Sequence, residues 1–234
     1  MITAENLVKR FGADHVAVND VSFHVAPGEI MCLYGANGAG KTTTINMFLN
    51  FLQPSSGRAV ISGIDATAQP LLARRHLGFL SESVRLYDNF TAMQNILFFS
   101  RLGNEQAVGV EQCAAMLSEC GLDGKFHHRR VGTFSKGMRQ KAAFAICRIR
   151  NAKALFLDEP LSGLDPSAAD SVLDSIRKLC DAGAAVLMST HDLLRSSEIA
   201  DKVALMKSGQ LLARFSQAEL KNVNLTQLYR EAIN

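Results

Sequence analysis

The stretch Gly35-Ala36-Asn37-Gly38-Ala39-Gly40-Lys41-Thr42-Thr43 decides the fold of this chain. It fits the pattern G-x-x-x-x-G-K-S/T, in which glycines allow a tight turn and a close approach of the backbone to a ligand. The amide groups of such a loop, continued by the N-terminus of a helix, form a site for polyphosphate. We expect Lys41 to reach the β- and γ-phosphates of a nucleotide and the Thr42 hydroxyl to hold Mg²⁺.

The residues on either side predict a strand before this loop and a helix after it. Residues 29–34 contain a short apolar run, which is typical of a buried strand. Ile45, Phe48, Leu49 and Leu52 then recur on one helical face. An accidental glycine-rich turn would not require this setting, whereas a phosphate-binding loop does.

Length and composition limit the class of protein. The 234 residues, 47% of them hydrophobic, suffice for one large domain with a sizeable core. A net charge of +3 is too small to indicate a nucleic-acid partner. The five cysteines show no C-x-x-C spacing, so we expect free thiols in a reducing compartment, with neither a zinc site nor a disulfide framework.

No segment of the sequence reads as a membrane anchor. The first ten residues lack the apolar region of a signal peptide, and no apolar run approaches 18 residues. We therefore expect a partner to supply the membrane part if this protein works on a membrane.

Two more buried strands are predicted to end in polar residues. Residues 154–157 form an apolar run that leads into Asp158 and Glu159, and residues 184–189 lead to His191. Ligands of open α/β sheets bind at the carboxyl ends of the strands. A solvated acidic pair and a structural histidine are the alternatives. Beside a phosphate loop, the pair fits an aspartate for Mg²⁺ and a glutamate for the attacking water.

Two further positions have both a structural and a functional interpretation. Ser135 is predicted to cap a helix, whose N-terminus could be ordinary or could hold an anion. Phe11, between strands predicted at residues 2–8 and 16–25, is either a core aromatic or a ring that stacks on a nucleobase.

After residue 90 the sequence pattern predicts helices. Thr91-Ala92-Met93-Gln94 fits a capping box. The basic run at residues 125–130 is predicted to be a solvated loop, and residues 217–234 a short amphipathic helical tail.

Taken in order, these residues resemble the motifs of the ATP-binding subunit of ABC transporters. The resemblance covers nearly the whole chain and rests on six ordered motifs. The matches are Phe11 with the adenine-stacking aromatic, residues 35–42 with Walker A, Glu82 with the Q-loop, residues 135–138 with the signature, residues 155–159 with Walker B, which residues 163–165 follow as the D-loop, and His191 with the switch histidine.

The sequence departs from the family pattern at three motifs. Glu82 stands where glutamine is usual, and Lys136 and Met138 replace a glycine and a glutamine of the signature. Ala36 takes a position where proline is frequent. A glutamate Q-loop with a Phe-Ser-Lys-Gly-Met signature is similar to the exporter branch that handles drugs, antibiotics, lipids or sodium.

The resemblance implies an α/β fold with a P-loop ATPase core. The core has a mainly parallel sheet, an N-terminal antiparallel β subdomain and an inserted α-helical subdomain. The expected limits are residues 1–90 and 151–216 for the core with its β subdomain, residues 91–150 for the helical subdomain, and residues 217–234 for the tail.

The resemblance also implies a site for ATP and Mg²⁺, with a role for each matching residue. Catalytic roles are expected for Glu159, His191 and Lys41. The expected ligands of Mg²⁺ are Thr42, Glu82 and Asp158. The expected nucleotide contacts come from Phe11, Gly35, Asn37, Gly38, Ala39, Gly40, Lys41, Thr42, Thr43, Ser135, Gly137 and Asp165.

The partners follow from the same resemblance. We expect a head-to-tail dimer of identical or related subunits, in which Ser135 and Gly137 of one subunit close over ATP held by the other. An integral-membrane permease would dock on residues 83–103, at the cytoplasmic face of the inner membrane; no nucleic acid is expected. A soluble ABC ATPase that acts on ribosomes or DNA is the alternative, but the chain has one motif set and no sustained heptads. An importer ATPase is a further alternative, disfavoured by Glu82 and Lys136.

Overall fold

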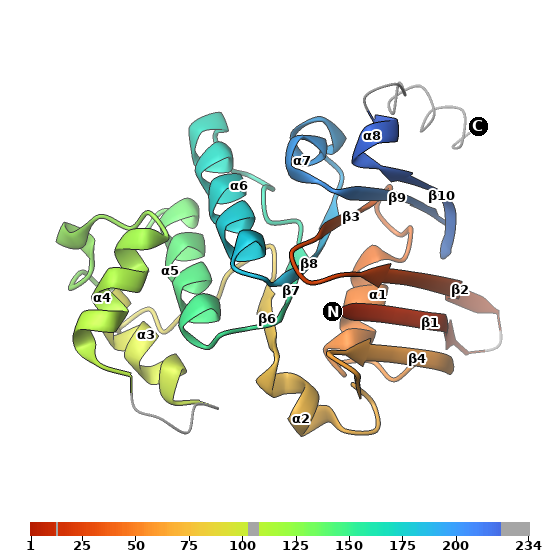
Figure 1. Ribbon diagram of the computed structural model, residues 1–234, viewed down its shortest axis with the longest axis horizontal. Helices are drawn as coiled ribbons and strands as arrows, with labels where there is room; N and C mark the ends of the chain where they lie inside the picture. The colour runs from red at the N-terminus through yellow and green to blue at the C-terminus, as the bar shows by residue number, and fades with distance from the viewer. Residues whose placement is uncertain (13, 103–107, 221–234) are drawn as a thin grey trace.

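The computed structural model describes residues 1–12, 14–102 and 108–220, and its strands form two sheets (Figure 1). The larger sheet has the order β10-β9-β3-β8-β7-β6. Its strands are β3 (Ile30–Tyr34), β6 (Leu77–Leu80), β7 (Ala154–Asp158), β8 (Ala185–Thr190), β9 (Lys202–Lys207) and β10 (Gln210–Ser216). All neighbours pair in parallel except β10, which returns antiparallel to β9 through the turn at Ser208 and Gly209. The sheet is therefore mainly parallel, as predicted.

The smaller sheet is antiparallel and lies at the opposite end of the molecule from α3 and α4 (Figure 1). It has the order β2-β1-β4-β5. Its strands are β1 (Ile2–Phe11), β2 (His15–Val25), β4 (Ser56–Ile61) and β5 (Ile64–Asp65). Buried residues alternate along β1 and β2, so one face of this sheet is covered.

The helices form on local signals that the sequence carries. They are α1 (Lys41–Phe48), α2 (Pro70–Arg75), α3 (Ala92–Arg101), α4 (Val110–Glu119), α5 (Lys136–Ile149), α6 (Pro166–Asp181), α7 (Leu193–Ile199) and α8 (Gln217–Leu220). Thr91 and Gln94 form the predicted capping box of α3. Ser135 caps α5, and Asp165 caps α6 with Pro166 in its first turn.

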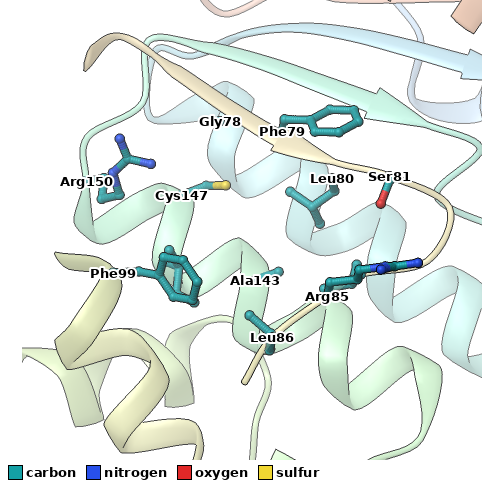
Figure 2. A pocket seen from close by; sticks show the side chains of 12 residues that line it. Gly78, Phe79, Leu80, Ser81, Arg85, Leu86, Phe99, Ala143, Cys147 and Arg150 are labelled. Atoms are coloured by element: carbon teal, nitrogen blue, oxygen red, sulfur yellow. The ribbon is translucent and has the colours of Figure 1, made fainter. Parts of the chain in front are cut away.

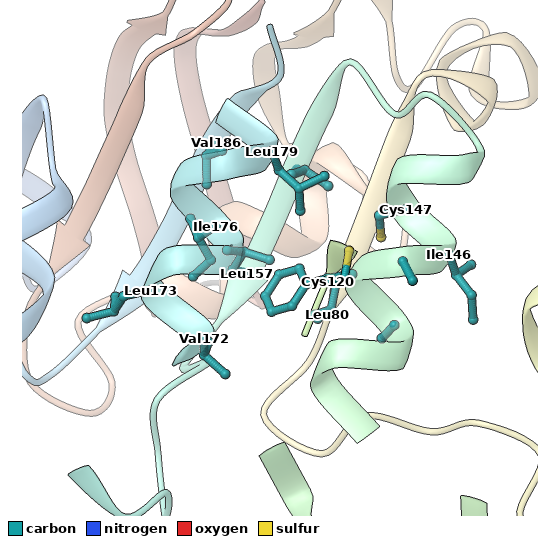
Figure 3. Close-up of a cluster of buried hydrophobic side chains, with 14 of the residues drawn as sticks. Leu80, Cys120, Ile146, Cys147, Leu157, Val172, Leu173, Ile176, Leu179 and Val186 are labelled. Atoms are coloured by element: carbon teal, nitrogen blue, oxygen red, sulfur yellow. The ribbon is translucent and has the colours of Figure 1, made fainter. Parts of the chain in front are cut away.

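The two faces of the larger sheet belong to two hydrophobic cores. In β7, Ala154 and Phe156 face the core shared with α1 and the smaller sheet. Leu155 and Leu157 face the core shared with α3 to α6. Figure 3 shows this second core, in which Leu157 of the sheet lies between side chains of α6 and α5, and Val186 lies beside Leu179 of α6. The helical group and the sheet thus share one continuous core.

Several elements differ from the sequence prediction. The helices α2 and α7 and the 3₁₀ turns Gly124–Phe126 and Val131–Thr133 were not expected, because each is short and its residues lack a full amphipathic period. The first 3₁₀ turn overlaps the start of the basic run that was predicted to be a solvated loop, and the second follows directly after this run. The predicted tail begins as α8, and residues 221–234 lie outside the described residues. The subdomain limits stay a prediction.

Within the described ranges, no helix is both long enough and apolar enough to cross a bilayer.

Candidate functional site

The glycine-rich loop joins β3 to α1, as the flanking sequence predicts. Gly40 is the N-cap of α1 and has φ +108°, a left-handed conformation that favours glycine. A Cβ atom there would lie 2.6 Å from the carbonyl oxygen of Ala17 in β2, so the loop packs directly on the backbone of the smaller sheet. The loop is thereby held with its amides around the start of a helix, where an anion is favoured.

Lys41 is buried, and its ammonium group contacts the loop itself. Nζ donates to the carbonyl oxygens of Gly35 at 2.7 Å and Ala36 at 3.3 Å. Nζ also lies 3.5 Å from Glu159 Oε1, and both side chains are largely shielded from solvent. The lysine is therefore positioned between the loop and the end of β7.

Thr42 and Asp158 bring two hard oxygen groups together. The Thr42 hydroxyl lies 3.0 Å from each carboxylate oxygen of Asp158. Ser189, directly opposite Asp158 in the register of β7 and β8, donates to Asp158 Oδ1 at 2.5 Å. Ser189 Oγ also accepts from the backbone amide of Glu159 at 3.1 Å. One buried serine thus orients both acidic residues.

Glu159 has a backbone φ of +51°, which is rare for a residue other than glycine. Its Oε2 atom accepts from the amide of His191 at 3.2 Å and lies 2.7 Å from His191 Nδ1. The side chain is therefore held between Lys41 on one side and His191 on the other. Because such strained residues persist only where their surroundings hold them, this conformation marks a candidate functional position.

A pocket of about 370 Å³ gathers these groups. The residues that line it are Phe11, His15, Ala17, Ala36, Asn37, Gly38, Ala39, Gly40, Lys41, Thr42, Thr43, Glu82, Asp158 and Glu159. The phosphate loop, the acidic pair and Phe11 were each predicted from separate stretches of the sequence. The fold brings them to one cavity. His191 does not line this cavity but contacts Glu159, which does.

Phe11 lies at one end of the pocket and is 44% exposed. The His15 ring stacks on it with a centroid separation of 6.0 Å, and Lys9 Nζ lies 5.2 Å from its ring centre. Such an exposed ring is not a core aromatic, and its free area can take a flat apolar group.

Glu82 follows β6 and lines the same pocket. Its Oε1 atom accepts from the Ser162 hydroxyl at 2.7 Å. Its carboxylate is thus held beside the turn that follows Glu159.

Besides His191, four predicted site residues do not line this pocket. Ser135 and Gly137 lie at the N-terminus of α5, where the Ser135 hydroxyl accepts from the amide of Met138 at 3.3 Å. Asp165 accepts from the amide of Ala168 at 2.9 Å as the cap of α6. Gly35 is linked to the pocket only indirectly, because its carbonyl oxygen accepts a hydrogen bond from Lys41, which lines the pocket.

The sequence prediction missed several residues of the site, among them Ser189 and His15. Ser189 carried a signal, because it ends the same buried strand that leads to His191, but its partners depend on the register of β7 and β8. His15 carried none, since only the pairing of β1 with β2 places it opposite Phe11.

Comparisons with known proteins show what this chain is similar to. A model of the family described as "ABC transporter" matches residues 18–162. An uncharacterized ABC transporter ATP-binding protein of Bacillus subtilis, YxlF, is 37% identical over 98% of this chain and 75% of its own length. The daunorubicin/doxorubicin resistance ATP-binding protein DrrA of Streptomyces peucetius is 34% identical over 94% of this chain and 67% of its own length.

A solved structure titled as the ATP binding subunit of an ABC transporter superposes with a TM-score of 0.86 at 26% identity, covering all of both chains. The fold that carries the phosphate loop, the acidic pair on β7 and the histidine after β8 is therefore that of a known ATP-binding subunit. The chain belongs to the ABC transporter family, as an ATP-binding protein with the fold of its ATPase subunits.

Proposed function

We propose that this chain binds ATP with Mg²⁺ in the pocket above, hydrolyses it, and as a dimer powers export through a separate membrane permease. The observation that carries this proposal is the position of Glu159. Its carboxylate lies 3.5 Å from Lys41 and 2.7 Å from His191, at the wall of the pocket that the phosphate loop lines. A base for the attacking water must stand beside the terminal phosphate, and a carboxylate at the wall of the phosphate-loop pocket supports this role for Glu159.

The donor set fits Mg²⁺. Thr42 and Asp158 offer hard oxygen ligands 3.0 Å apart, and Glu82 adds a second carboxylate to the same pocket. Among the described residues, no three or more His, Cys, Asp or Glu side chains gather into a metal site made of protein ligands alone. Mg²⁺ usually binds through one or two carboxylates plus substrate phosphates, so this sparse set suits it. When bound, it would neutralise charge on the phosphate oxygens.

The remaining roles follow from what each group contacts. Lys41 now donates to two carbonyls of its own loop, and phosphate oxygens would take up that donor capacity. Phe11 offers an exposed ring for the adenine base. His191 orients Glu159 through its amide and Nδ1, and its exposed side chain is free to meet the γ-phosphate.

A second subunit would complete the site. Ser135 is exposed and Gly137 lies in the first turn of α5, but neither lines the pocket of its own chain. Their helix N-terminus is a site for an anion, and a head-to-tail partner would bring it to the terminal phosphate. Hydrolysis then removes the charge that both helices hold, so the population shifts from a closed to an open dimer.

Permease docking is supported by a second pocket, of about 300 Å³, between β6, α5 and the segment that follows Glu82 (Figure 2). Leu80, Leu86, Phe99 and Ala143 supply apolar walls. An inserted segment of the permease would contact residues on both sides of Glu82 and so sense the nucleotide pocket. Export is the direction that the relation to the drug-resistance protein DrrA favours.

Replacing Glu159 with glutamine tests the proposal. Glu159→Gln should keep ATP binding, accumulate as an ATP-dependent dimer, and lose hydrolysis by about 10²–10⁴-fold, the usual contribution of a general base. Glu111→Gln, on the exposed first turn of α4, is the matched control and should behave as wild type. Near wild-type phosphate release by Glu159→Gln would show that Glu159 is not the base.

Cofractionation tests the partner. A multi-spanning membrane protein that copurifies with the chain supports the permease, whereas isolation as a ribosome- or DNA-bound protein would favour the soluble alternative.

A further inference from the structure

The turn that follows Glu159 is held by two side chains of α5. Lys136 Nζ donates to the carbonyl oxygen of Ser162 at 2.5 Å, and Gln140 Nε2 donates to the carbonyl oxygen of Pro160. Residues 136 and 140 are one helical turn apart and therefore lie on one face of α5. The helix thus grips two carbonyl groups of a single turn.

Neither side chain stabilises α5 at its position. Lys136 lies in the first turn, where the helix dipole disfavours a cation. Gln140 is fully buried, and its Oε1 atom has no hydrogen-bond partner among the described residues. A buried amide with an unpaired oxygen lowers stability. Both residues are explained by the contacts that their nitrogen atoms make with the turn.

The turn needs external support because of Glu159. The left-handed backbone of Glu159 is strained and persists only if its surroundings determine it. Ser189 holds the amide of Glu159, and within the turn the Ser162 amide donates to the Glu159 carbonyl at 3.2 Å. Lys136 and Gln140 hold the other side of the same turn.

We propose that Lys136 and Gln140 are positioning residues that fix the Glu159 carboxylate for hydrolysis. The proposal rests on the proposed function and adds a role for a lysine that departs from the signature pattern. Ser162 also donates to Glu82 at 2.7 Å, so the same turn links the start of α5 to the segment after β6. A shift of about 1 Å in a reacting group can cost as much as 10²-fold in rate, so even small movements of this turn matter.

Lys136→Met removes the ammonium group and keeps most of the aliphatic stem. We expect kcat for ATP hydrolysis to fall about tenfold while KM changes less than about twofold, because the base moves and nucleotide contacts stay. Lys136→Arg should restore most of kcat, since it can donate to the same carbonyl. Lys141→Met is the matched control on the same helix, beside Gly121, and should behave as wild type.

The Glu159→Gln background separates this role from a direct contact with the partner's nucleotide. If Lys136 acts through Glu159, Lys136→Met removes no further single-turnover activity in that background. The double variant should also form the ATP-dependent dimer at the same ATP concentration as Glu159→Gln alone, by size-exclusion chromatography.

Additive losses, or a double variant that no longer dimerises, would overturn the positioning role and leave the proposed function standing. Near wild-type hydrolysis by Glu159→Gln would overturn the proposed function itself. Gln140→Met, which keeps the length but removes the donor, should show the same loss in kcat alone. Wild-type kcat in both folded variants, Lys136→Met and Gln140→Met, would refute the proposal.

Discussion

Replacing Gly40 with alanine tests whether the phosphate loop packs as tightly as the structure indicates. The new Cβ atom would lie 2.6 Å from the Ala17 carbonyl oxygen and 2.8 Å from the Met206 methyl group. The methyl group can move aside, but the carbonyl belongs to the backbone of β2. A non-glycine residue at φ +108° is strained as well.

Gly38 offers a matched control within the same loop. It also has a positive φ, +82°, but a Cβ there would meet nothing within 4 Å. The left-handed backbone alone should lower the free energy of unfolding by about 1–2 kcal/mol in Gly38→Ala. Overpacking adds about 1–3 kcal/mol, so Gly40→Ala should lose about 2–5 kcal/mol in total.

Urea denaturation without nucleotide, followed by circular dichroism, measures both losses. A titration with a fluorescent ATP analogue measures the function of the loop, and Gly40→Ala should bind more weakly because the start of α1 must shift. Equal losses of stability in the two variants would refute the close approach of the loop to β2. A Gly40→Ala protein as stable as wild type would do so more strongly.

Three further predictions concern the nucleotide and the buried thiols. Lys41→Ala should lose most nucleotide affinity, because charged hydrogen bonds contribute about 1.5–3 kcal/mol each, and unchanged binding would remove the phosphate-loop assignment. Phe11→Ala should weaken ATP and GTP equally, by about 1–3 kcal/mol, since stacking is tolerant of the base; a loss for one nucleotide alone would contradict stacking. Burial raises the pKa of Cys32 and Cys147 from 9.0 to about 12 and that of Cys120 and Cys180 to about 11. Because the unfolded thiols ionise first, stability should be intact below pH 9 and fall between pH 9 and about 11–12, by at most about 1.4 kcal/mol per thiol per pH unit. Thermal unfolding across this range measures the slope, and Cys32→Ala with Cys147→Ala should flatten it; an unchanged slope would contradict the assignment.

Local patterns predicted the elements whose signals lie within a few residues. The capping box at Thr91 and the serine cap of α5 both formed where the sequence placed them. The apolar runs predicted the individual strands, whereas the mainly parallel sheet was implied by the resemblance to ABC ATPase subunits. The short helices α2 and α7 escaped prediction because one or two turns carry too little periodicity and are stabilised by packing instead.

In the candidate site too, local motifs were predictable and contacts between distant segments were not. The motif residues that line the pocket could be named one by one, because each motif is a short string with its own chemistry. Their convergence required the order of strands in the larger sheet, which sets β7 and β8 side by side and β3 next to β8. Glu82 shows the limit: its position was predicted, but its contact with Ser162, 80 residues away, was not.

The sequence alone determined that a phosphate-binding loop joins a buried strand to a helix, and that acidic residues and a histidine each follow a buried strand. Glycine geometry, apolar periodicity and capping are local, so they can be read from the chain. Only the tertiary structure decided how Glu159 is held. Ser189, Lys136 and Gln140 reach its turn from 20 to 30 residues away. Those contacts depend on strand register and on the face that α5 turns to the sheet, which no short stretch of sequence specifies.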